Sequence, residues 1–504
     1  MFSNPLVDLN GFLLDELIKD LAIIGISNFK NWEIDHVTDN SKNIKRNSLF
    51  IAIKGFNVDG HQYISEAISR GAVTIIGENK IEADQDFTYI RVKNSRKALA
   101  ELVNKIYNNL SEKIRLIGVT GTAGKTTTSS MIDHIITKIV GKSGLIGTLY
   151  NKIGTEYFQD PNKFTTPDII TLNKFFAKMI ESKVDYLTME VSSHGLKLDR
   201  VWGLDYDVGI FTNLSYDHME FHKTLEDYYR SKERLFKYLE EDKAAVFNLD
   251  DKYANKLIEI TKANVYTYGI YNKNADITAK DIKLGKEGLE FTVSINHDII
   301  SNLGKIVHPI TARLKIPLLG YHNIYNTLAA FTTALILGFP LFKIKTAIES
   351  FRGIKRRMEV IYNQEFTIID DFAHNPASLT ANFQTLKSFK YNKVIMVHFL
   401  KGKRGIPANR LNAQLMSNWA KELKLAKIIT TRAEEEVISK NKVLLEEEEA
   451  FTEIIKANGI DIENTARLRE AIELALSEIK KNDLLLIVGG PGLDRAAEVI
   501  KEYL

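Results

Sequence analysis

Ten residues, Gly118 to Thr127, have the sequence GVTGTAGKTT and include the residue types that hold phosphate groups. An apolar run precedes them and apolar residues at helical spacing follow them, which predicts a strand, a glycine turn and a helix. Turn N–H groups, the helix N-terminus and the Lys125 ammonium would neutralise phosphate charge, and Thr126 is placed to hold Mg²⁺. Because Val119 stands at the first glycine of the usual GxxxxGK[ST] pattern, a purely structural turn is the alternative. The residues predicted to bind nucleotide here are Gly121, Thr122, Ala123, Gly124, Lys125, Thr126 and Thr127.

Two predicted strands end in acidic and imidazole side chains. One leads into Glu190, and the next leads into the segment TNLSYDHMEFH, which contains His218. Ligands of parallel α/β sheets bind at the carboxyl ends of the strands, so these side chains would lie beside the glycine turn. Carboxylate and imidazole ligands suit a divalent cation. The grouping therefore predicts metal binding by Glu190 and His218, with helix capping or simple solvation as the alternative.

Lys232 lies within an apolar stripe of a predicted helix. Burial would favour its neutral amine, and a neutral amine can take up CO₂ as a carbamate, which is a carboxylate-like metal ligand. The pattern by itself favours the alternative, a lysine whose stem covers apolar surface while its ammonium reaches solvent. The stripe comprises Leu225, Tyr228, Tyr229, Leu235, Phe236 and Leu239.

Three further segments could line a ligand site. Amides in the segment GYHNIYN, which ends at Asn326, could contact an adenine edge or cap the helix that follows. A later strand ends in DDFAHNP, preceded by RRME, and its Arg, Asp and His could close over a nucleotide held elsewhere. The turns at 40–42 and 55–61 could line a cleft or be surface turns.

Alternating strands and helices predict an α/β protein of three domains. These are a small α/β N-terminal domain (1–110), a central P-loop ATPase-type domain with a parallel sheet (111–350), and a C-terminal Rossmann-like α/β domain (351–504). No G-x-G-x-x-G follows the first strand of the third domain, so a dinucleotide is not implied. Residues 433–449 are rich in Glu and are predicted to be a solvated acidic insertion. The strands predicted outside the central domain are 48–53, 73–76, 88–92, 367–369, 394–398, 427–430 and 484–488.

The composition narrows the class of protein. Hydrophobic residues make up 44% and charged residues 26%, which excludes bulk disorder. A net charge of +3 without a basic block argues against a nucleic-acid partner. The absence of cysteine excludes disulfides and thiolate metal sites. No apolar run approaches the ~20 residues that span a bilayer, and no signal peptide is evident, so we expect a cytoplasmic enzyme.

Together these motifs resemble the Mur ligase family, ATP-dependent amino-acid ligases of cell-wall precursor synthesis, and most closely its type E members. The resemblance covers nearly the whole chain. It implies ATP, two Mg²⁺ sites and a CO₂-derived carbamate on Lys232 as cofactors. It also implies a UDP-linked muramoyl-dipeptide and an amino acid as substrates, and a monomer. The motifs that carry it are GTAGKTT, TTPD at 165–168, EVSSHGL, the following Arg200, TNLSYDH and YYRSKERLF.

The resemblance also assigns roles to single residues. Lys125 would be catalytic, together with Glu190, His218 and Lys232, and the last three would join Thr126 as metal ligands. The ATP side would include Asn326, Arg357, Asp371 and His374. Contacts to the muramoyl-peptide would come from Thr165, Thr166, Ser192 and Arg200, and the nucleotide-sugar pocket from Ser41, Phe56, Asn57 and Val58.

The third domain departs from the family pattern on the acceptor side. Thr430 to Glu434 replace the usual Asp-Asn-Pro-Arg motif, and Arg356 stands where a glycine is usual. Arg404 remains for the acceptor α-carboxylate, and Gly490 and Asp494 lie in the loop near its amino end. Thr430 to Glu434 do not reproduce the motif that selects meso-diaminopimelate, while Asp494 and Glu434 to Glu436 add negative charge. We therefore predict a basic acceptor, L-lysine before ornithine, with a solvated acidic face as the alternative.

The sequence therefore predicts an ATP-dependent acid–amino-acid ligase that forms an acyl phosphate. A related ligase of another polymer, such as a pseudomurein precursor or a cyanophycin-like peptide, is the alternative within this class. A P-loop regulatory NTPase is the alternative from another class, although the chain lacks the Asn-Lys-x-Asp motif of a GTPase. A degenerate binding protein is less compatible with the intact motifs.

Overall fold

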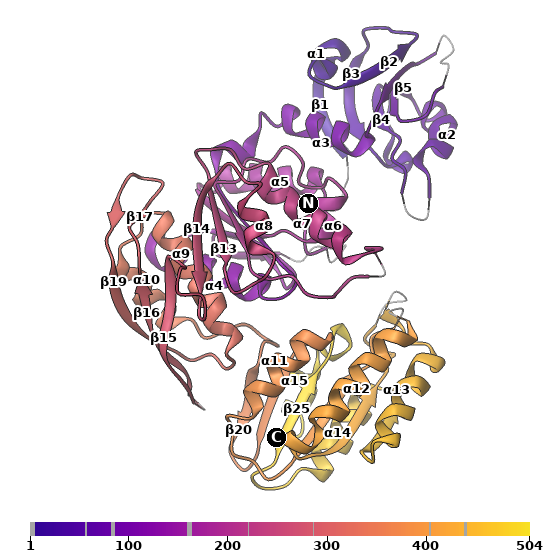
Figure 1. Ribbon diagram of the computed structural model, residues 1–504. Coiled ribbons are helices and arrows are strands. Elements are labelled where there is room, and N and C mark those ends of the chain that lie inside the picture. The colour runs from indigo at the N-terminus through magenta and orange to yellow at the C-terminus, as the bar shows by residue number, and fades with distance from the viewer. Residues whose placement is uncertain are drawn as a thin grey trace.

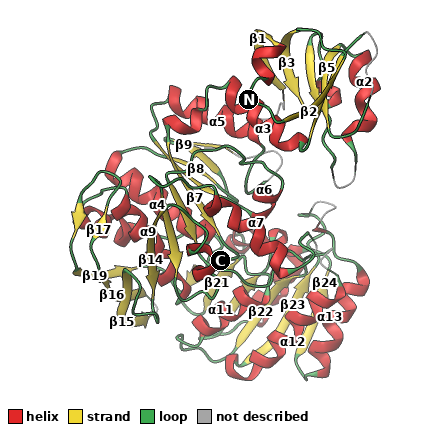
Figure 2. Cartoon of the chain, turned by 45° about the horizontal axis from the view of Figure 1, so that its top comes forward, coloured by secondary structure: helices red, strands yellow, loops and turns green. Residues whose placement is uncertain are grey.

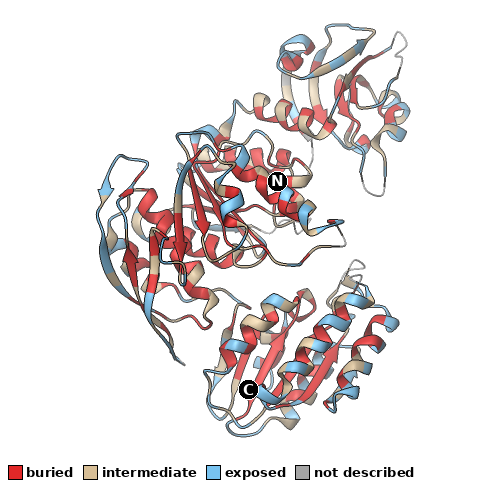
Figure 3. Ribbon diagram, in the orientation of Figure 1, coloured by how far each residue is buried: buried red, intermediate tan, exposed pale blue. Residues whose placement is uncertain are grey.

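The structure of the chain is a computed structural model that describes residues 6–55, 58–81, 86–158, 164–219, 221–285, 287–402, 405–437 and 441–504. Three large sheets follow one another along the chain, and each is covered by helices (Figures 1 and 2). We call the parts built around them the first, central and third units. The middle strands of each sheet are buried, while edge strands and the outer helix faces are partly exposed (Figure 3).

The first unit has a six-stranded sheet of order β1-β3-β4-β5-β6-β2. The middle four strands are parallel, and β1 and β2 pair antiparallel at the edges. Sequence patterns did not predict β1 to β3, because β2 contains Gly25 and exposes Ile24 and Ile26. Its elements are β1 (Leu6–Leu13), α1 (Leu14–Ile18), β2 (Ile23–Ser27), β3 (Glu33–Thr38), η1 (Ser41–Asn43), β4 (Ser48–Ile51), η2 (Gly60–Tyr63), α2 (Ile64–Ser69), β5 (Ala72–Gly77), β6 (Thr88–Val92) and α3 (Ser95–Ile106).

The core of the first unit includes side chains from the central unit. Leu102 and Val103 of α3 belong to a buried cluster that also contains Ile169 and Ile170, which begin a helix of the central unit. Trp202 packs against the same cluster, and its indole Nε1 donates to Glu101 at 2.9 Å. The first two units therefore share one hydrophobic core across their boundary.

The central unit has an eleven-stranded sheet of order β10-β9-β8-β11-β7-β12-β13-β14-β15-β16-β19. Its elements are η3 (Leu110–Lys113), β7 (Arg115–Thr120), α4 (Lys125–Val140), β8 (Gly144–Ile146), β9 (Asn151–Ile153), β10 (Glu156–Phe158), α5 (Ile169–Glu181), β11 (Tyr186–Glu190), α6 (Ser193–Lys197), β12 (Val208–Phe211), α7 (Leu225–Lys237), β13 (Ala244–Asn248), α8 (Ala254–Ile258), β14 (Asn264–Gly269), β15 (Ile277–Gly285), β16 (Gly288–Ile295), β17 (Ile299–Ile300), β18 (Ile306–Val307), β19 (Ile310–Ile316), α9 (His322–Ile336) and α10 (Leu341–Ser350).

The predicted parallel sheet is present only in the middle of this unit. The seven strands from β8 to β15 in the sheet order are parallel, whereas β9 and β10 at one end and β16 and β19 at the other pair antiparallel. The paired ends of β15 and β16, Gly285 and Gly288, are three positions apart in the chain, and so short a connection allows only antiparallel pairing. Helices α4, α9 and α10 cover one face, and α5, α7 and α8 cover the other. The functional strand ends of β7, β11 and β12 lie in the parallel middle.

The third unit has a six-stranded sheet of order β20-β21-β25-β22-β23-β24, in which only β20 is antiparallel. The four predicted strands are confirmed, and the two edge strands were missed because they are short, polar and partly exposed. Its elements are β20 (Glu359–Asn363), β21 (Thr367–Asp371), α11 (Pro376–Leu386), β22 (Val394–Phe399), α12 (Ile406–Leu423), β23 (Leu425–Thr431), α13 (Leu445–Ala457), β24 (Asp461–Thr465), α14 (Leu468–Glu478), β25 (Leu484–Val488), η5 (Pro491–Leu493) and α15 (Ala496–Lys501).

The prediction of a solvated acidic insertion is wrong for the start of α13. Glu447 and Glu448 are only 1% and 6% exposed. The Glu447 carboxylate accepts from two backbone N–H groups, those of Gly405 at 2.9 Å and Leu444 at 3.0 Å. Glu448 Oε2 accepts from Arg432 Nη1 at 2.8 Å. These partners compensate for the loss of water around Glu447 and around one oxygen of Glu448.

Within the described part of the chain, no helix is both long enough and apolar enough to cross a membrane.

Candidate active site

The glycine turn, residues 121–124, joins β7 to α4 as predicted. Gly121 and Gly124 have φ angles of +152° and +86°, which side-chain-bearing residues rarely adopt. A Cβ at these positions would lie 1.9 Å from Thr212 Oγ1 and 2.5 Å from Asn326 Oδ1. Both glycines are therefore required for the close packing of this turn against the next strand end and α9.

The turn is held in shape by Asn213, which sequence analysis did not assign. Its carbonyl oxygen accepts from Thr122 N at 2.8 Å, and its Oδ1 accepts from Ala123 N at 2.9 Å. Two N–H groups expected to face phosphate are therefore engaged within the protein. The donors offered by geometry are instead those of the first turn of α4, which an α-helix leaves without partners inside the helix.

Lys125 and Lys232 come together beneath the turn. Lys125 Nζ donates to the carbonyl oxygens of Gly121 at 2.9 Å and Thr122 at 3.0 Å. Lys232 Nζ donates to the Gly121 carbonyl oxygen at 2.7 Å and lies 4.5 Å from the Tyr228 ring centroid. Lys232 is only 1% exposed, so its ammonium does not reach solvent as the alternative required.

The surroundings of these two lysines lower the pKa of both, and that of Lys232 more strongly. Burial, followed by the positive charge of Lys125, holds the pKa of Lys232 well below its ordinary value, while Asp217 opposes the shift. Burial also lowers the pKa of Lys125, against the opposing charges of Glu190 and Asp217. A buried amine with a lowered pKa is the species that the carbamate hypothesis needs.

Glu190, at the end of β11, lies directly beside the N-terminus of α4. It is 1% exposed, and its Oε2 accepts from Thr126 Oγ1 at 3.0 Å. Thr148, which sequence analysis missed, donates to Glu190 through both its backbone N at 2.8 Å and its hydroxyl at 3.0 Å. The hydroxyl and carboxylate oxygens of Thr126 and Glu190 are a donor set that suits Mg²⁺.

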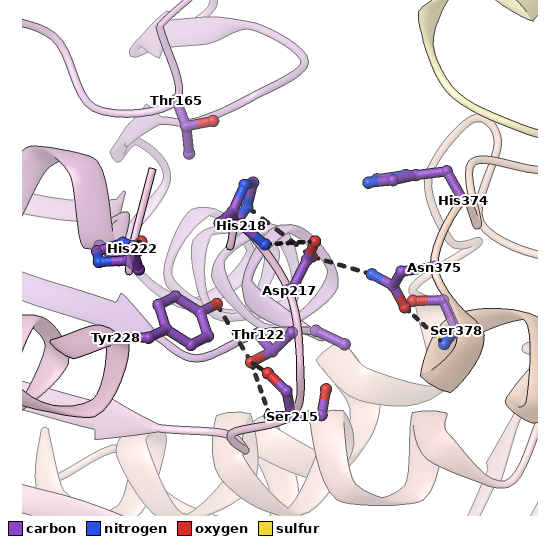
Figure 4. A network of polar contacts seen from close by, with 12 residues as sticks. Thr122, Thr165, Ser215, Asp217, His218, His222, Tyr228, His374, Asn375 and Ser378 are labelled. Carbon is purple, nitrogen blue, oxygen red and sulfur yellow. Dashed lines mark hydrogen bonds and ion pairs between the residues drawn. The ribbon is translucent and has the colours of Figure 1, made fainter. Parts of the chain in front are cut away.

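His218 lies in the loop after β12. Because β7, β11 and β12 are parallel, this loop is at the same edge of the sheet as the glycine turn and Glu190. Figure 4 shows His218 next to Asp217. Its φ of 57° is unusual for a residue with a side chain, and its backbone N donates to Asp217 Oδ1 at 2.9 Å. No three His, Asp or Glu side chains of the described residues form a ready-made metal site. His218 and Lys232 as metal ligands therefore stay predictions.

The four residues predicted to contact the muramoyl-peptide converge beside Glu190. Thr166 Oγ1 lies 2.9 Å from the Glu190 carbonyl oxygen and 3.0 Å from Ser192 Oγ. Arg200 Nη1 donates to the Thr166 carbonyl oxygen at 3.0 Å. Thr165 and Thr148 have their hydroxyl oxygens 3.1 Å apart. A polar wall thus continues from the glycine turn along the strand ends.

Ser41 and Val58 of the predicted sugar-nucleotide pocket belong to the first unit and not to the strand ends of the central unit. Ser41 is buried and donates to Glu66 Oε2 at 3.2 Å, whereas Val58 is 49% exposed. Phe56 and Asn57 lie outside the described residues. Ser41 and Val58 thus both lie on the first unit, where Ser41 is bonded to a residue of that same unit.

On the third unit, Arg357 and Asp371 lie near each other at the start and the end of the β20–β21 pair. Asp371 accepts from the backbone N of Met358 and of Ala373, each at 2.7 Å. Burial lowers the pKa of Arg357, while the negative charges of Asp371 and Glu190 oppose the shift. The positive charge of Arg357 is thus partly balanced by these two carboxylates.

His374 and Asn326 are also near the boundary between these two units. His374 extends from the third unit toward the Asp217–His218 loop (Figure 4), and its Nδ1 lies 3.0 Å from the Phe372 carbonyl oxygen. The Asn326 amide does not cap α9: its Oδ1 accepts from Thr128 Oγ1 at 3.3 Å and its Nδ2 donates to Asn323 at 2.8 Å. Asn326 therefore links α9 to α4 behind the turn.

On the acceptor side, Arg356 occupies the crevice at the ends of β21 and β25. Its guanidinium donates to the carbonyl oxygens of Gly489 at 2.8 Å and Gly490 at 3.1 Å, and it pairs with Asp494. Its Nε also lies 3.2 Å from Asp370. Arg404 lies outside the described residues. The negative charge of Asp494 is thus already paired with the positive charge of Arg356.

The glutamates on which the prediction of a lysine acceptor rests also have partners within the chain. Glu434 pairs with Arg432 at 2.8 Å, and Glu436 pairs with Arg495 at 3.1 Å. The Glu435 carboxylate accepts from Leu468 N at 2.8 Å at the start of α14. The charge argument for a basic acceptor counted these groups as uncompensated, and they are not.

A glycine turn after a central parallel strand, with α/β units on both sides of it, defines a three-domain α/β enzyme of the P-loop type. Comparison with known proteins agrees. Family models match residues 33–107 ("Mur ligase family, catalytic domain"), 119–334 ("Mur ligase middle domain") and 356–490 ("Mur ligase, glutamate ligase domain"). The chain belongs to the Mur ligase family. Its fold class and its class as an ATP-dependent acid–amino-acid ligase are thereby confirmed.

Individual relatives are similar over nearly the whole length. A UDP-N-acetylmuramoyl-L-alanyl-D-glutamate–2,6-diaminopimelate ligase of Bacillus velezensis is 36% identical over 94% of this chain and 93% of that protein. A solved structure of a ligase with the same name has a TM-score of 0.66 at 24% identity, covering 96% of this chain and 94% of that one. A pseudomurein peptide ligase type C from Methanothermus fervidus has a TM-score of 0.57 at 19% identity, covering 90% and 100%. The fold alone therefore does not separate the two wall polymers.

Proposed function

We propose that this protein joins the carboxylate of a UDP-N-acetylmuramoyl-dipeptide to the amino group of an amino acid, with ATP converted to ADP and phosphate. The reaction would supply a peptidoglycan precursor in the cytoplasm, and the enzyme would act as a monomer. The relatives that are 36% identical carry the name of such a ligase.

The observation that carries the proposal is the meeting of two lysines at Gly121, next to Glu190 and the polar wall. Lys125 supplies positive charge where a transferring phosphoryl group needs it. Thr165, Thr166, Ser192 and Arg200 lie along the strand ends that lead away from that point. A carboxylate bound along this wall would therefore approach a phosphate held at the N-terminus of α4.

The chemistry has two steps. The substrate carboxylate attacks the γ-phosphorus of ATP, which forms an acyl phosphate and releases ADP. The amino group of the acceptor then attacks the acyl carbon, loses a proton and displaces phosphate. In both steps the chain acts chiefly by positioning its substrates and by compensating negative charge.

Bound Mg²⁺ would supply the charge neutralisation that lets two anions approach. Thr126 and Glu190 would hold one ion, and Glu190, His218 and a carbamate on Lys232 would hold a second. The buried amine and its lowered pKa support the carbamate, because uptake of CO₂ requires the uncharged amine.

We further propose that the domains 1–110, 111–350 and 351–504 divide the substrates among them. The first domain would bind the UDP part through Ser41, Phe56, Asn57 and Val58. The central domain would bind ATP, aided by the third-domain residues Arg357, Asp371 and His374. The third domain would bind the acceptor near Arg404, Gly490 and Asp494.

For the acceptor we propose a diamino acid. L-lysine is the first candidate from the sequence, although its charge argument is reduced by the ion pairs of Asp494, Glu434 and Glu436. 2,6-Diaminopimelate is the candidate that the names of the relatives favour. Both molecules carry a second amino group.

The test is phosphate release by the purified protein with ATP, UDP-muramoyl-dipeptide and a panel of lysine, ornithine, alanine and meso-diaminopimelate. Turnover should require all three substrates, and kcat/KM should rank the acceptors. Nucleotide hydrolysis that needs no amine would identify a regulatory NTPase instead. Turnover only with a sugar nucleotide of another polymer would replace the murein assignment.

A further inference from the structure

Asn375, at the start of α11 in the third unit, contacts both its own helix and the central unit (Figure 4). Its Oδ1 accepts from Ser378 N at 3.0 Å, which caps α11. Its Nδ2 donates to Asp217 Oδ2 at 3.0 Å. Asn375 and Asp217 are 5% and 7% exposed, so this bond is protected from water. The amide oxygen of Asn375 therefore accepts a hydrogen bond within the third unit, while its NH₂ group donates one to the central unit.

Asp217 belongs to the loop after β12 and also bonds to a backbone group of that loop. Its second carboxylate oxygen, Oδ1, accepts from His218 N at 2.9 Å and so stabilises the left-handed backbone of His218. Its negative charge opposes the lowering of the pKa of Lys125 and of Lys232. The carboxylate that Asn375 holds therefore orders the backbone of the loop and also contributes to the electrostatics of the two lysines.

We propose that Asn375 is a positioning residue that makes the geometry of the loop at 212–219 depend on docking of the third unit. Residues 212–215 are bonded within the central unit, whereas the part of the loop around Asp217 and His218 is fixed only when α11 is in place, because the bond to Asp217 is then complete. This inference rests on the proposed function only in that the loop would serve phosphoryl transfer.

The chain contains a second asparagine with the same arrangement, which provides a matched control. Asn94 caps α3, since its Oδ1 accepts from Arg96 N at 2.9 Å and Lys97 N at 3.1 Å. Its Nδ2 donates to Asp199 Oδ2 at 3.0 Å, across the boundary between the first and central units. Asp199 lies after α6, not in the loop at 212–219, and it also pairs with Arg234.

The experiment compares N375D with N94D in the full chain. Each substitution keeps the side-chain size and the capping oxygen, and replaces the amide donor by a carboxylate that faces an aspartate. Hydrogen–deuterium exchange of residues 212–219 is measured without nucleotide or metal, and kcat and KM for ATP are measured with substrates.

For N375D we expect about tenfold faster exchange of the loop and a similar fall in kcat, since a hydrogen bond to a charged group is lost. For N94D we expect faster exchange near α3 and unchanged exchange of the loop. Equal loop exchange in N375D and the unmodified protein would overturn the proposal. So would the same loop exchange and the same fall in kcat in both variants, because that result indicates a general structural role.

A double variant that exchanges the two side chains tests whether the bond between positions 217 and 375 can be restored. Combining D217N with N375D places the amide on the loop and the carboxylate on α11, so a bond of the same geometry can form in the opposite direction. Loop protection should return in the double variant; continued fast exchange would count against a direct bond between these positions. Because exchange is measured without ligands, this outcome is independent of which substrates the enzyme uses.

Discussion

Lys125 and Lys232 donate to the same acceptor, the carbonyl oxygen of Gly121, at 2.9 Å and 2.7 Å. Lys125 is the first residue of α4, and Lys232 lies in the middle of α7. Two helices that are far apart in sequence therefore bring their lysine amines to the same carbonyl oxygen. Two ammonium groups this close repel each other, and burial adds to the cost of charging either. The less exposed of the two, Lys232, is the one whose charge is least favoured.

Lys232→Ala should be nearly inactive, and a short carboxylic acid in solution should partly restore turnover by filling the space of the carbamate. Lys237→Ala, at the exposed end of the same helix, is the control. Carbon-13 NMR after addition of labelled bicarbonate should show a carbamate signal in the unmodified protein and none in Lys232→Ala. A signal that is equal in both proteins would place the modification elsewhere.

Lys125→Ala should lower ligase turnover by roughly 10²–10³-fold, because charge next to the transferring phosphoryl group is lost. The fold should persist, since the side chain bonds only to carbonyl oxygens of its own loop. Phosphate release is the measurement, with Lys138→Ala on the exposed face of α4 as control. Near-normal turnover in a folded Lys125→Ala protein would remove the nucleotide assignment.

Thr148→Val should raise the Mg²⁺ concentration needed for half-maximal turnover. Valine keeps the branched shape but removes the hydroxyl that donates to Glu190 at 3.0 Å, so the carboxylate loses one of the bonds that orient it. The melting temperature should change little. Thr155→Val, in the exposed turn before β10, should leave the Mg²⁺ response unchanged; an unchanged response in Thr148→Val too would show that Glu190 needs no such support.

The stability of the third unit should decrease in acid because of His398. Burial lowers the pKa of His398 from 6.5 to about 4, and its Nδ1 lies 3.0 Å from the Val488 carbonyl oxygen. The unfolded chain takes up the proton first, so the contribution is complete above pH ~6.5 and is lost as the pH falls toward 4, by roughly 3 kcal/mol. Urea unfolding from pH 4 to 7 should show this slope. The slope should be smaller in H398Q and unchanged in the control H308Q, which alters an exposed histidine.

Much of this arrangement follows from local sequence signals. The strand, turn and helix around Lys125 are fixed by apolar periodicity and by glycine, both of which are visible in a single stretch of chain. The apolar stripe around Lys232 is visible in the same way, but by itself it favoured a lysine whose ammonium reaches solvent, and the structure buries that ammonium. The predictions around Lys125 succeed because the physical cause lies within a few helical turns of the residue itself.

Other parts depend on contacts that no local pattern records. Thr148 follows a short strand with no distinctive spacing, and it matters only because Glu190 is close in space. The acidic residues of 434–436 suggested an open negative surface, but Arg432 and Arg495 pair with two of them. Asn375 carries a helix-cap signal, whereas its bond to Asp217 joins residues 158 positions apart. Long-range pairing of polar groups is what single-sequence reasoning lacks.

The hydrophobic core shared by the first two units has a consequence for the order of events during synthesis. The last strand of the first sheet ends at Val92, but Ile169 and Ile170, which complete the packing around Leu102 and Val103, are made later. Part of the apolar surface of the nascent first unit should therefore stay uncovered, and its core incomplete, until α5 has left the ribosome. Folding of this enzyme from its N-terminus is thereby coupled to translation of the segment that carries the glycine turn.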